Sequence, residues 1–485
     1  MTSWLAAFGL LAAFVLVARA LGLTERSRRV LATTRESMAV MRAASLTDEQ
    51  KEAALQANAI ALFKSFFTLS TGLAIAALLP ATVLWLCDRL GWLSFDRVLA
   101  VSFSPAFLIA SGAVVIATLL WGGRPATPDA ESYSGVDRAL HRVAFATYEV
   151  QADLADIEDR LFASHLGSVT NQRPVFITSL PRAGTTLLLE CCAALDEFAS
   201  HTYRDMPFVM VPCLWSSFSG AFRREGQLKP RAHGDGMQID FDSPEALEEV
   251  LWLKFWEKQY LADRVVPWPS LPRQEFTTFL ARHMRKIAFV RRGDRAEGVR
   301  YISKNNLNIA RIPLVRQMFP DATIVVPVRA PLDHCSSLLQ QHRQFSELHA
   351  RDAFASRYMR AIGHFDFGEH LRPVDFDRWY DGRAEKDALM LSFWLEYWVA
   401  AYRHLLTTDR ALVHFLDYDR LCADPVPGLR RLAERIDCRD ADGLLASAEG
   451  IRPARVRSVD TTGVPPELLR HAQETYDALC AAARA

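Results

Sequence analysis

The sequence lacks the residue patterns that mark several common protein classes. Its eight cysteines include no Cys-x-x-Cys pair, which argues against zinc ribbons, dithiol redox sites and a disulfide framework. Lysine is scarce, with 8 lysines against 48 arginines, and the formal net charge is zero, so the composition gives no case for nucleic-acid binding. No internal repeat or low-complexity segment is visible. We expect a chain with reduced cysteines, and its excess of arginine and alanine favours a bacterial source.

Charged residues are missing from three long stretches in the first quarter of the chain. Residues 1–18, 65–87 and 98–123 contain no Asp, Glu, Lys or Arg. Because about 20 apolar residues cross the hydrocarbon core of a bilayer, we predict transmembrane helices at 1–21, 65–87 and 98–121, of which the first is marginal in length. The alternative for the second and third stretches is a helical hairpin buried in a soluble core, and their length argues against it.

Basic residues near these stretches predict their orientation. The connection between the first two carries Arg19, Arg26, Arg28, Arg29, Arg35, Arg42, Lys51 and Lys64, whereas the next connection carries only Arg89 and Arg97. The positive-inside rule places the first connection, and everything after the third stretch, in the cytoplasm. We therefore expect a multi-pass inner-membrane protein. Its parts are a membrane region with a cytosolic helical segment at 1–123, a linker and helix at 124–170, and a main domain at 171–485.

Strand-like and helix-like segments alternate in the main domain. Short apolar runs predict strands near 174–178, 287–290, 299–304, 323–329 and 411–418. Ser243 followed by Pro244 predicts the start of a helix that runs to residue 258. Such alternation is typical of an α/β fold, in which helices cover a parallel sheet.

One turn of this domain, Pro-Arg-Ala-Gly-Thr-Thr at 181–186, joins a predicted strand to a predicted helix. The helix start exposes backbone N–H groups and the positive end of the helix dipole, which suits a phosphate group. Arg182 can add a planar charged fork. A nucleoside-triphosphate-hydrolysing loop needs Gly-Lys followed by Ser or Thr, but Thr185 follows Gly184. The alternative is an ordinary turn with Arg182 facing solvent.

Two further basic residues are predicted at strand ends. Arg329 ends a strand at the carboxyl edge of the sheet, where open α/β folds bind ligands. Ser337 lies two helical turns further on, so the two side chains form a second candidate phosphate clamp. Lys304 ends another predicted strand; its alternative is a surface lysine.

In this order, these segments resemble the PAPS-dependent sulfotransferases. The resemblance is to the branch with Pro-Arg-x-Gly-Thr-Thr, which includes protein-tyrosine sulfotransferases and related bacterial enzymes. The matching segments are 180–187, 303–305, 319–322, 326–337, 415–421 and 424–425. The resemblance spans about 174–435. It implies a P-loop-like parallel sheet and transfer of a sulfuryl group from PAPS (3′-phosphoadenylyl sulfate) to a hydroxyl group.

The resemblance also implies roles for individual residues. The 5′-phosphosulfate of PAPS would be held by Arg182, Ala183, Gly184, Thr185 and Thr186, the 3′-phosphate by Arg329 and Ser337, and the nucleotide would lie against Tyr418. Sulfuryl transfer depends on positioning and on neutralising charge at the leaving oxygens, as phosphoryl transfer does. Arg182 and Lys304 would supply this positive charge.

A base must remove the proton of the acceptor hydroxyl. Related enzymes place an acidic residue or a histidine after the first helix, and we predict Asp205 here, with His201 as the alternative. Asp205 can instead cap a helix or pair with Arg204. A polar insert holds His233, Asp235, Asp240 and Asp242, whose spacing matches no defined metal site. We therefore expect no metal.

The expected partners are the lipid bilayer and a hydroxyl-bearing acceptor such as a glycan, a glycolipid or another envelope-associated molecule. A soluble acceptor would give little reason for membrane spans. Whether the chain forms an oligomer stays open. Two other functions remain: a nucleotide-dependent kinase or NTPase on a similar sheet, and a catalytically silent membrane interaction protein.

Overall fold

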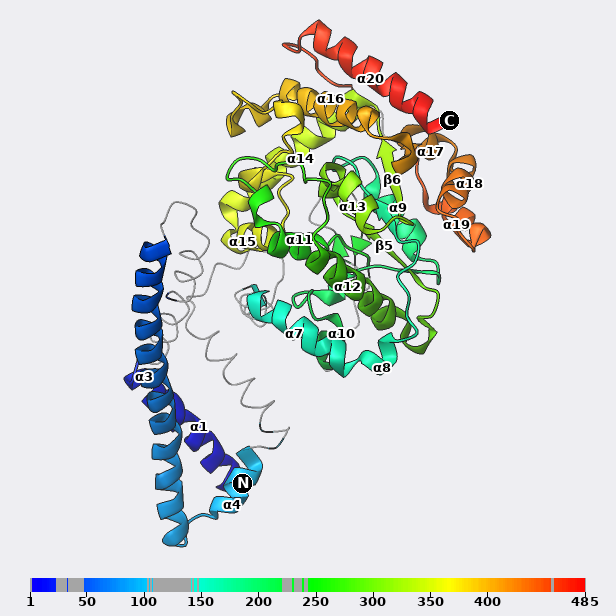
Figure 1. Ribbon diagram of the computed structural model, residues 1–485. Helices are drawn as coiled ribbons and strands as arrows, with labels where there is room; N and C mark the ends of the chain where they lie inside the picture. Colours follow the sequence, from blue (N-terminus) through cyan, green and yellow to red (C-terminus); the bar gives the residue numbers. More distant parts are fainter. Residues whose placement is uncertain are drawn as a thin grey trace. The chain divides into compact units, whose positions relative to one another are not determined.

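The chain forms two compact units, Met1–Thr127 and Pro128–Ala485, in a computed structural model (Figure 1). The structure describes residues 2–22, 33, 48–102, 104, 107, 141, 144–145, 148–219, 229–230, 238–239, 243–454 and 458–484.

The first unit is helical in its described part, with α1 (Thr2–Ala20), α3 (Asp48–Arg89) and α4 (Phe95–Ser102). Within the described residues, one helical stretch, Ala61–Arg89, has the length and the apolar composition to cross a membrane. It contains the predicted span at 65–87. The three-span prediction is thus supported at one span, and most of the predicted span at 98–121 lies outside the described residues.

The second unit is built on a five-stranded sheet in the order β2-β5-β1-β6-β7. The strands are β1 (Val175–Ile177), β2 (Phe198–Ala199), β5 (Arg300–Lys304), β6 (Thr323–Val328) and β7 (His414–Asp417). All neighbouring pairs are parallel, with Phe176 opposite Ser303 on one side and Ile324 on the other. A short antiparallel pair, β3 (Lys229–Pro230) and β4 (Gln238–Ile239), stands apart. The predicted α/β class is confirmed.

Helices pack on both faces of this sheet (Figure 1). The helices of the second unit are α7 (Tyr148–Leu161), α8 (Ala163–Leu166), α9 (Thr185–Ala193), α10 (Pro212–Ser219), α11 (Glu249–Phe255), α12 (Gln274–Arg292), α13 (Ile312–Met318), α14 (Pro331–Arg351), α15 (Ala353–Ala361), α16 (Leu391–Thr407), α17 (Tyr418–Ala423), α18 (Pro425–Arg435), α19 (Ala441–Ala446) and α20 (Pro466–Arg484). Figure 1 shows α16 lying beside α20 and packing on α14.

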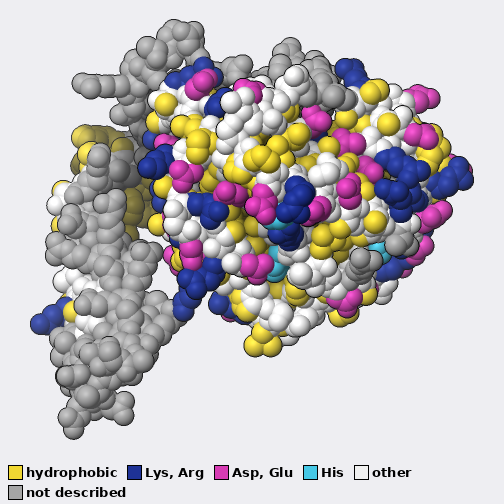
Figure 2. Space-filling view, turned by 90° about the horizontal axis from the view of Figure 1, so that it is seen from above, with side chains coloured by type: hydrophobic (Ala, Val, Ile, Leu, Met, Phe, Trp, Pro, Cys, Tyr) yellow, Lys and Arg dark blue, Asp and Glu magenta, His cyan; other side chains and the backbone are white. Residues whose placement is uncertain are grey.

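The core divides along the central strand. Phe176 packs into one hydrophobic cluster, whereas its neighbours Val175 and Ile177 pack into the other. This follows from the two-residue period of a strand, because successive side chains point to opposite faces. All three side chains are buried, as expected for a parallel strand with helices on both sides. On the outer face that Figure 2 shows, acidic and basic side chains are interspersed with apolar ones.

Two local predictions are wrong. Residues 287–290 lie within α12 rather than in a strand. Ile287 continues the buried face of Phe276, Leu280 and Met284 at helical spacing, so the apolar run belongs to a helix. The helix predicted from Ser243 begins only at Glu249, because Pro244 instead pairs with Thr202 in an isolated bridge.

The parallel strands bring their carboxyl ends to one edge of the sheet. The turn at 178–184 follows β1, Asn305 follows β5, Arg329 follows β6 and Tyr418 follows β7. Segments far apart in the sequence therefore meet at this edge, as ligand sites of open α/β folds do.

Candidate active site

The turn after β1 has a constrained backbone. Arg182 and Gly184 adopt positive φ angles of 71° and 95°. A Cβ atom on Gly184 would lie 2.2 Å from Cδ2 of Tyr418, so only glycine fits here. Gly184 immediately precedes α9, whose start has no side-chain cap. Since the first N–H groups of a helix have no intrahelical acceptor, this turn presents an anion-binding surface.

Side chains from neighbouring elements hold this turn in place. Ser179 Oγ donates to the Pro327 carbonyl oxygen at 2.8 Å and lies 2.6 Å from the Tyr402 hydroxyl. Trp398 Nε1 donates to His334 Nδ1 at 3.1 Å. The other ring nitrogen of His334, Nε2, lies 2.8 Å from the Pro181 carbonyl oxygen and therefore donates to it.

His334 is neutral in this arrangement. Burial, followed by the positive charge of Arg329, lowers the pKa of His334 to about 3. The neutral ring accepts on one nitrogen and donates from the other, which couples α16 to the turn through α14. The sequence analysis did not predict this role, although His334 lies within the segment 326–337 that it singled out.

Arg182, Arg329 and Ser337 lie together. Arg182 Nε donates to Ser337 Oγ at 3.3 Å, and Arg329 Nη1 donates to the Arg182 carbonyl oxygen at 3.2 Å. The Arg329 guanidinium lies 5.8 Å from the ring centroid of Tyr418. The two predicted phosphate clamps are therefore neighbours.

Arg329 Nε is an orphaned donor. It is buried, and no described residue accepts a hydrogen bond from it. Buried donors are normally paired, so this donor fits an anionic ligand between the two arginines. The turn, the start of α9 and the two guanidinium groups together suit a ligand with more than one phosphate-like group.

A cavity of about 160 Å³ opens beside the turn. Its lining includes Arg182, Thr185, Thr186 and Lys304, so the structure brings four of the predicted site residues to one cavity. The lining also includes Tyr203, Glu245, Glu249, Tyr358, His364 and Asp366. These carboxylates and aromatic rings suit a polar, uncharged partner.

Asp205 and His201 belong to a different network. Neither is among the residues that line the cavity. Asp205 accepts from the Thr202 backbone N–H at 2.9 Å and from Arg291, and its Oδ2 lies 3.3 Å from His201 Nδ1. Burial is the largest single effect and would raise the pKa of Asp205, but the charge of Arg291 and the contacts with His201 and Arg291 together outweigh it and lower this pKa below its ordinary value. The catalytic roles of Asp205 and His201 stay predictions.

The carboxylates in the cavity wall differ in their partners. Glu249 is neutralised by the buried Arg311 at 2.5 Å and also accepts from Asn305 at 2.7 Å. Glu245 accepts a hydrogen bond from the hydroxyl of Tyr203. Sequence reasoning missed both glutamates and Tyr203, because positions 203, 245 and 249 share no motif and meet only through folding.

Comparison with known proteins identifies the region that holds this site. A profile described as the sulfotransferase family matches residues 174–442. Sulfotransferase STF1 from Mycobacterium tuberculosis H37Rv is 16% identical, with a TM-score of 0.39, and the alignment covers 76% of this chain and 91% of that one. Sulfotransferase STF9 from Mycobacterium avium is 14% identical, with a TM-score of 0.39, and the alignment covers 75% of this chain and 89% of that one. No curated protein matches the chain.

Proposed function

This chain belongs to the sulfotransferase family, and we propose that it transfers a sulfuryl group from PAPS to a hydroxyl group, a reaction of the EC 2.8.2 type. One observation carries the proposal. The anion-binding turn, Arg329 with its orphaned Nε, and Lys304 meet at the same edge of the sheet. When bound, PAPS supplies an activated sulfuryl group.

The residues at the turn would bind the two ends of PAPS. The start of α9, with Arg182, Ala183, Gly184, Thr185 and Thr186, suits the 5′-phosphosulfate. Arg329 and Ser337 suit the 3′-phosphate, and Tyr418 lies beside them. Donors that are fixed before the ligand arrives stabilise developing charge most effectively, and the bonds from Ser179 and His334 support such a fixed turn.

Lys304 is the proposed donor to the leaving oxygen. It lies at the end of β5 with a side chain that is largely buried and lines the cavity. A compact ammonium group in a site with little water stabilises charge more strongly than one at the surface.

We place the proton acceptor at Glu245, with Asp205 and His201 as the alternatives. Glu245 lines the cavity and has a neutral partner in Tyr203. Glu249 is less suitable, because the charge of Arg311 already compensates it. A positioned carboxylate of this kind contributes typically 10² to 10⁴ in rate, as an order of magnitude.

We also propose that the protein is a multi-pass inner-membrane protein with its sulfotransferase unit in the cytoplasm. The stretch Ala61–Arg89 carries exposed apolar side chains, among them Phe67 and Leu78, as lipid contact would require. The basic residues that precede it support the cytoplasmic orientation. The acceptor would then be a glycan, a glycolipid or another envelope-associated molecule.

Membranes that contain the full-length protein provide the test. They are incubated with PAPS labelled in the sulfuryl group, and the lipid and glycan fractions are extracted. We expect label with the wild type, none with Lys304→Ala, and wild-type label with Lys386→Ala, since Lys386 is an exposed lysine outside the cavity. Intact PAPS binding without transfer to either fraction would refute the acceptor class. Preference for ATP over 3′,5′-ADP would favour a kinase.

A further inference from the structure

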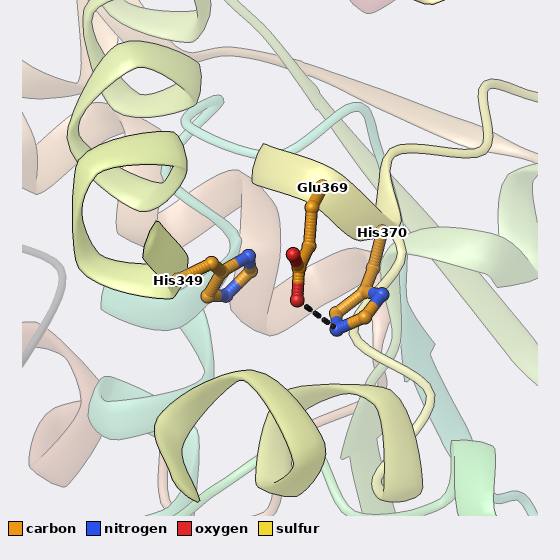
Figure 3. A group of neighbouring side chains, drawn as sticks. All are labelled: His349, Glu369 and His370. Atoms are coloured by element: carbon orange, nitrogen blue, oxygen red, sulfur yellow. Dashed lines mark ion pairs between the residues drawn. The ribbon is translucent and has the colours of Figure 1, made fainter. Parts of the chain in front are cut away.

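A second cluster of polar side chains lies at the far end of α14. It contains His349 from the last turn of this helix, and Glu369 and His370 from the short helix η6 (Gly368–His370). One possible ligand atom from each side chain lies within 4.8 Å of the other two. Figure 3 shows the Glu369 carboxylate between the two imidazole rings. None of the three lines the cavity described above.

His349 is the unusual member of this cluster. Its residue is only 4% exposed, and neither ring nitrogen has a hydrogen-bond partner among the described residues. Buried polar groups are normally paired, because an unpaired one loses its hydration without compensation. The His349 ring lies against the His370 ring, with centroids 5.1 Å apart. A ligand between the two rings would satisfy one of the two unpaired nitrogens of His349.

We propose that His349, Glu369 and His370 bind a divalent first-row transition-metal ion, for which Zn²⁺ is the best match. Two imidazoles and one carboxylate form a donor set of zinc sites that leave a fourth position for water. Calcium and magnesium prefer sites made of oxygen ligands, and two imidazoles in three ligands argue against both.

The geometry requires a modest contraction. Bonds of about 2.0–2.2 Å to a tetrahedral ion place ligand atoms roughly 3.3–3.6 Å apart. Glu369 and His370 already approach at 3.2 Å between Oε1 and Nε2. Since the Glu369 side chain is half exposed, it can rotate toward His349.

The surroundings favour ligation. Ser356 donates to Glu369 Oε1, and its own Oγ and carbonyl oxygen each lie 3.0 Å from His370 Nε2. The contact from Ser356 orients the Glu369 carboxylate as a ligand, whereas a metal bond from His370 Nε2 would replace the contacts of this nitrogen to Ser356.

The ordinary alternative is a hydrogen-bonded cluster without a metal. It accounts for Glu369 and His370, which have partners in Ser356, but it leaves His349 unexplained. No metal was expected from the sequence, on the spacing of the insert residues, and the cluster gave no signal because α15 (Ala353–Ala361) and a loop separate His349 from Glu369 and His370. The insert residues His233, Asp235, Asp240 and Asp242 lie outside the described residues.

A metal here would join two parts of the candidate active site. The helix α14 carries Ser337 near its start, and the segment 363–367, which ends next to η6, contributes to the cavity wall. An ion at the cluster would pin this segment to α14. This consequence rests on the proposed function, whereas metal binding itself does not.

The test uses the full-length chain without a histidine tag, purified in detergent and treated with a chelator. Zn²⁺ is then titrated, bound metal is counted by elemental analysis, and Co²⁺ is added separately to record its ligand-field absorption. We expect one equivalent of Zn²⁺, a higher thermal midpoint with the ion, and a visible spectrum of four-coordinate Co²⁺.

Variants at Glu369 and His370, the two less buried ligands, leave the buried His349 unchanged. Glu369→Gln and His370→Gln should each weaken Zn²⁺ binding by more than about 10-fold, while the control His165→Gln, at an exposed histidine outside the cluster, should bind as the wild type does. No stoichiometric Zn²⁺ binding by the wild type, or wild-type affinity in both cluster variants, would overturn the proposal. Zn²⁺ binding by a chain that fails to bind 3′,5′-ADP would leave the metal site standing and remove the sulfotransferase function.

Discussion

The two sides of the candidate active site are built in different ways. The donor side consists of a backbone turn with Arg182, a helix start, and Arg329 at the end of β6; His334 of α14 and Tyr402 of α16 hold the turn in place. The acceptor side consists of Tyr203, Glu245 and other side chains from separate loops. Fixed backbone N–H groups and guanidinium groups suit the binding of a highly charged sulfuryl donor. A variable acceptor is suited to side chains on loops, which change without disturbing the sheet.

The largest effect is expected from removing charge on the donor side. Lys304→Ala and Arg182→Ala should each lower kcat/KM for sulfuryl transfer about 10² to 10³-fold, because each removes a donor to developing charge. The labelled-PAPS assay measures this, with Lys386→Ala as the matched control. A rate within about threefold of the wild type in both variants would mean that the donor side lies elsewhere.

The next largest effect is expected on the acceptor side, where a substitution should change the transfer rate but not nucleotide binding. Glu245→Gln should lower the transfer rate by about 10² or more while the affinity for 3′,5′-ADP stays unchanged, since Glu245 belongs to the acceptor wall. Asp205→Asn should act mainly on stability, because it weakens a buried pair with Arg291. The transfer rates and thermal midpoints of both variants show whether Glu245 or Asp205 is the proton acceptor. If Asp205→Asn abolishes transfer in a chain with a normal thermal midpoint, the proton acceptor is Asp205.

A smaller effect should follow from Gly184→Ala. The added Cβ would meet the ring of Tyr418, and the positive φ angle disfavours alanine. We expect 3′,5′-ADP to bind about 10-fold more weakly, with a lower thermal midpoint of the sulfotransferase unit. Calorimetric titration checks this, and Gly382→Ala is the control, because Gly382 also has a positive φ angle but has no atom within 4 Å of the added Cβ. Equal losses in both variants would mean that backbone strain alone is responsible.

The smallest effect is expected from Ser337→Ala. This change removes one neutral hydroxyl from the second clamp and leaves Arg329 in place. A single hydrogen bond contributes about 0.5–1.5 kcal/mol, so 3′,5′-ADP should bind roughly 2- to 10-fold more weakly, with no change in binding of 5′-ADP. An equal loss for both nucleotides would show that Ser337 does not contact the 3′-phosphate.

The difference between the two sides also explains what the sequence could predict. Strands β1, β5, β6 and β7 were predicted: β1 and β6 are buried apolar runs, whereas β5 has charged ends and β7 is half-buried. Strand β2 has only two residues and gave no pattern. Donor-side residues were found because Arg329 directly follows β6 and Arg182 lies in the turn between β1 and α9, where the topology determines their neighbours.

The acceptor side could not be predicted in the same way. Tyr203 and Glu245 are 42 positions apart and meet through a hydrogen bond that no local motif encodes. The contacts of His334 likewise depend on α16, which follows it much later in the chain. Long-range side-chain contacts of this kind need the folded structure.

Binding of 3′,5′-ADP to the full-length protein tests the central claim most directly. Calorimetry would compare 3′,5′-ADP with 5′-ADP and ATP, for the wild type and for Arg329→Ala. The account predicts that the wild type binds 3′,5′-ADP at least about 10-fold more tightly than either competitor, since one charge-assisted clamp contributes about 1.5–3 kcal/mol, and that Arg329→Ala removes this preference. Equal or tighter binding of ATP by the wild type would contradict a PAPS site.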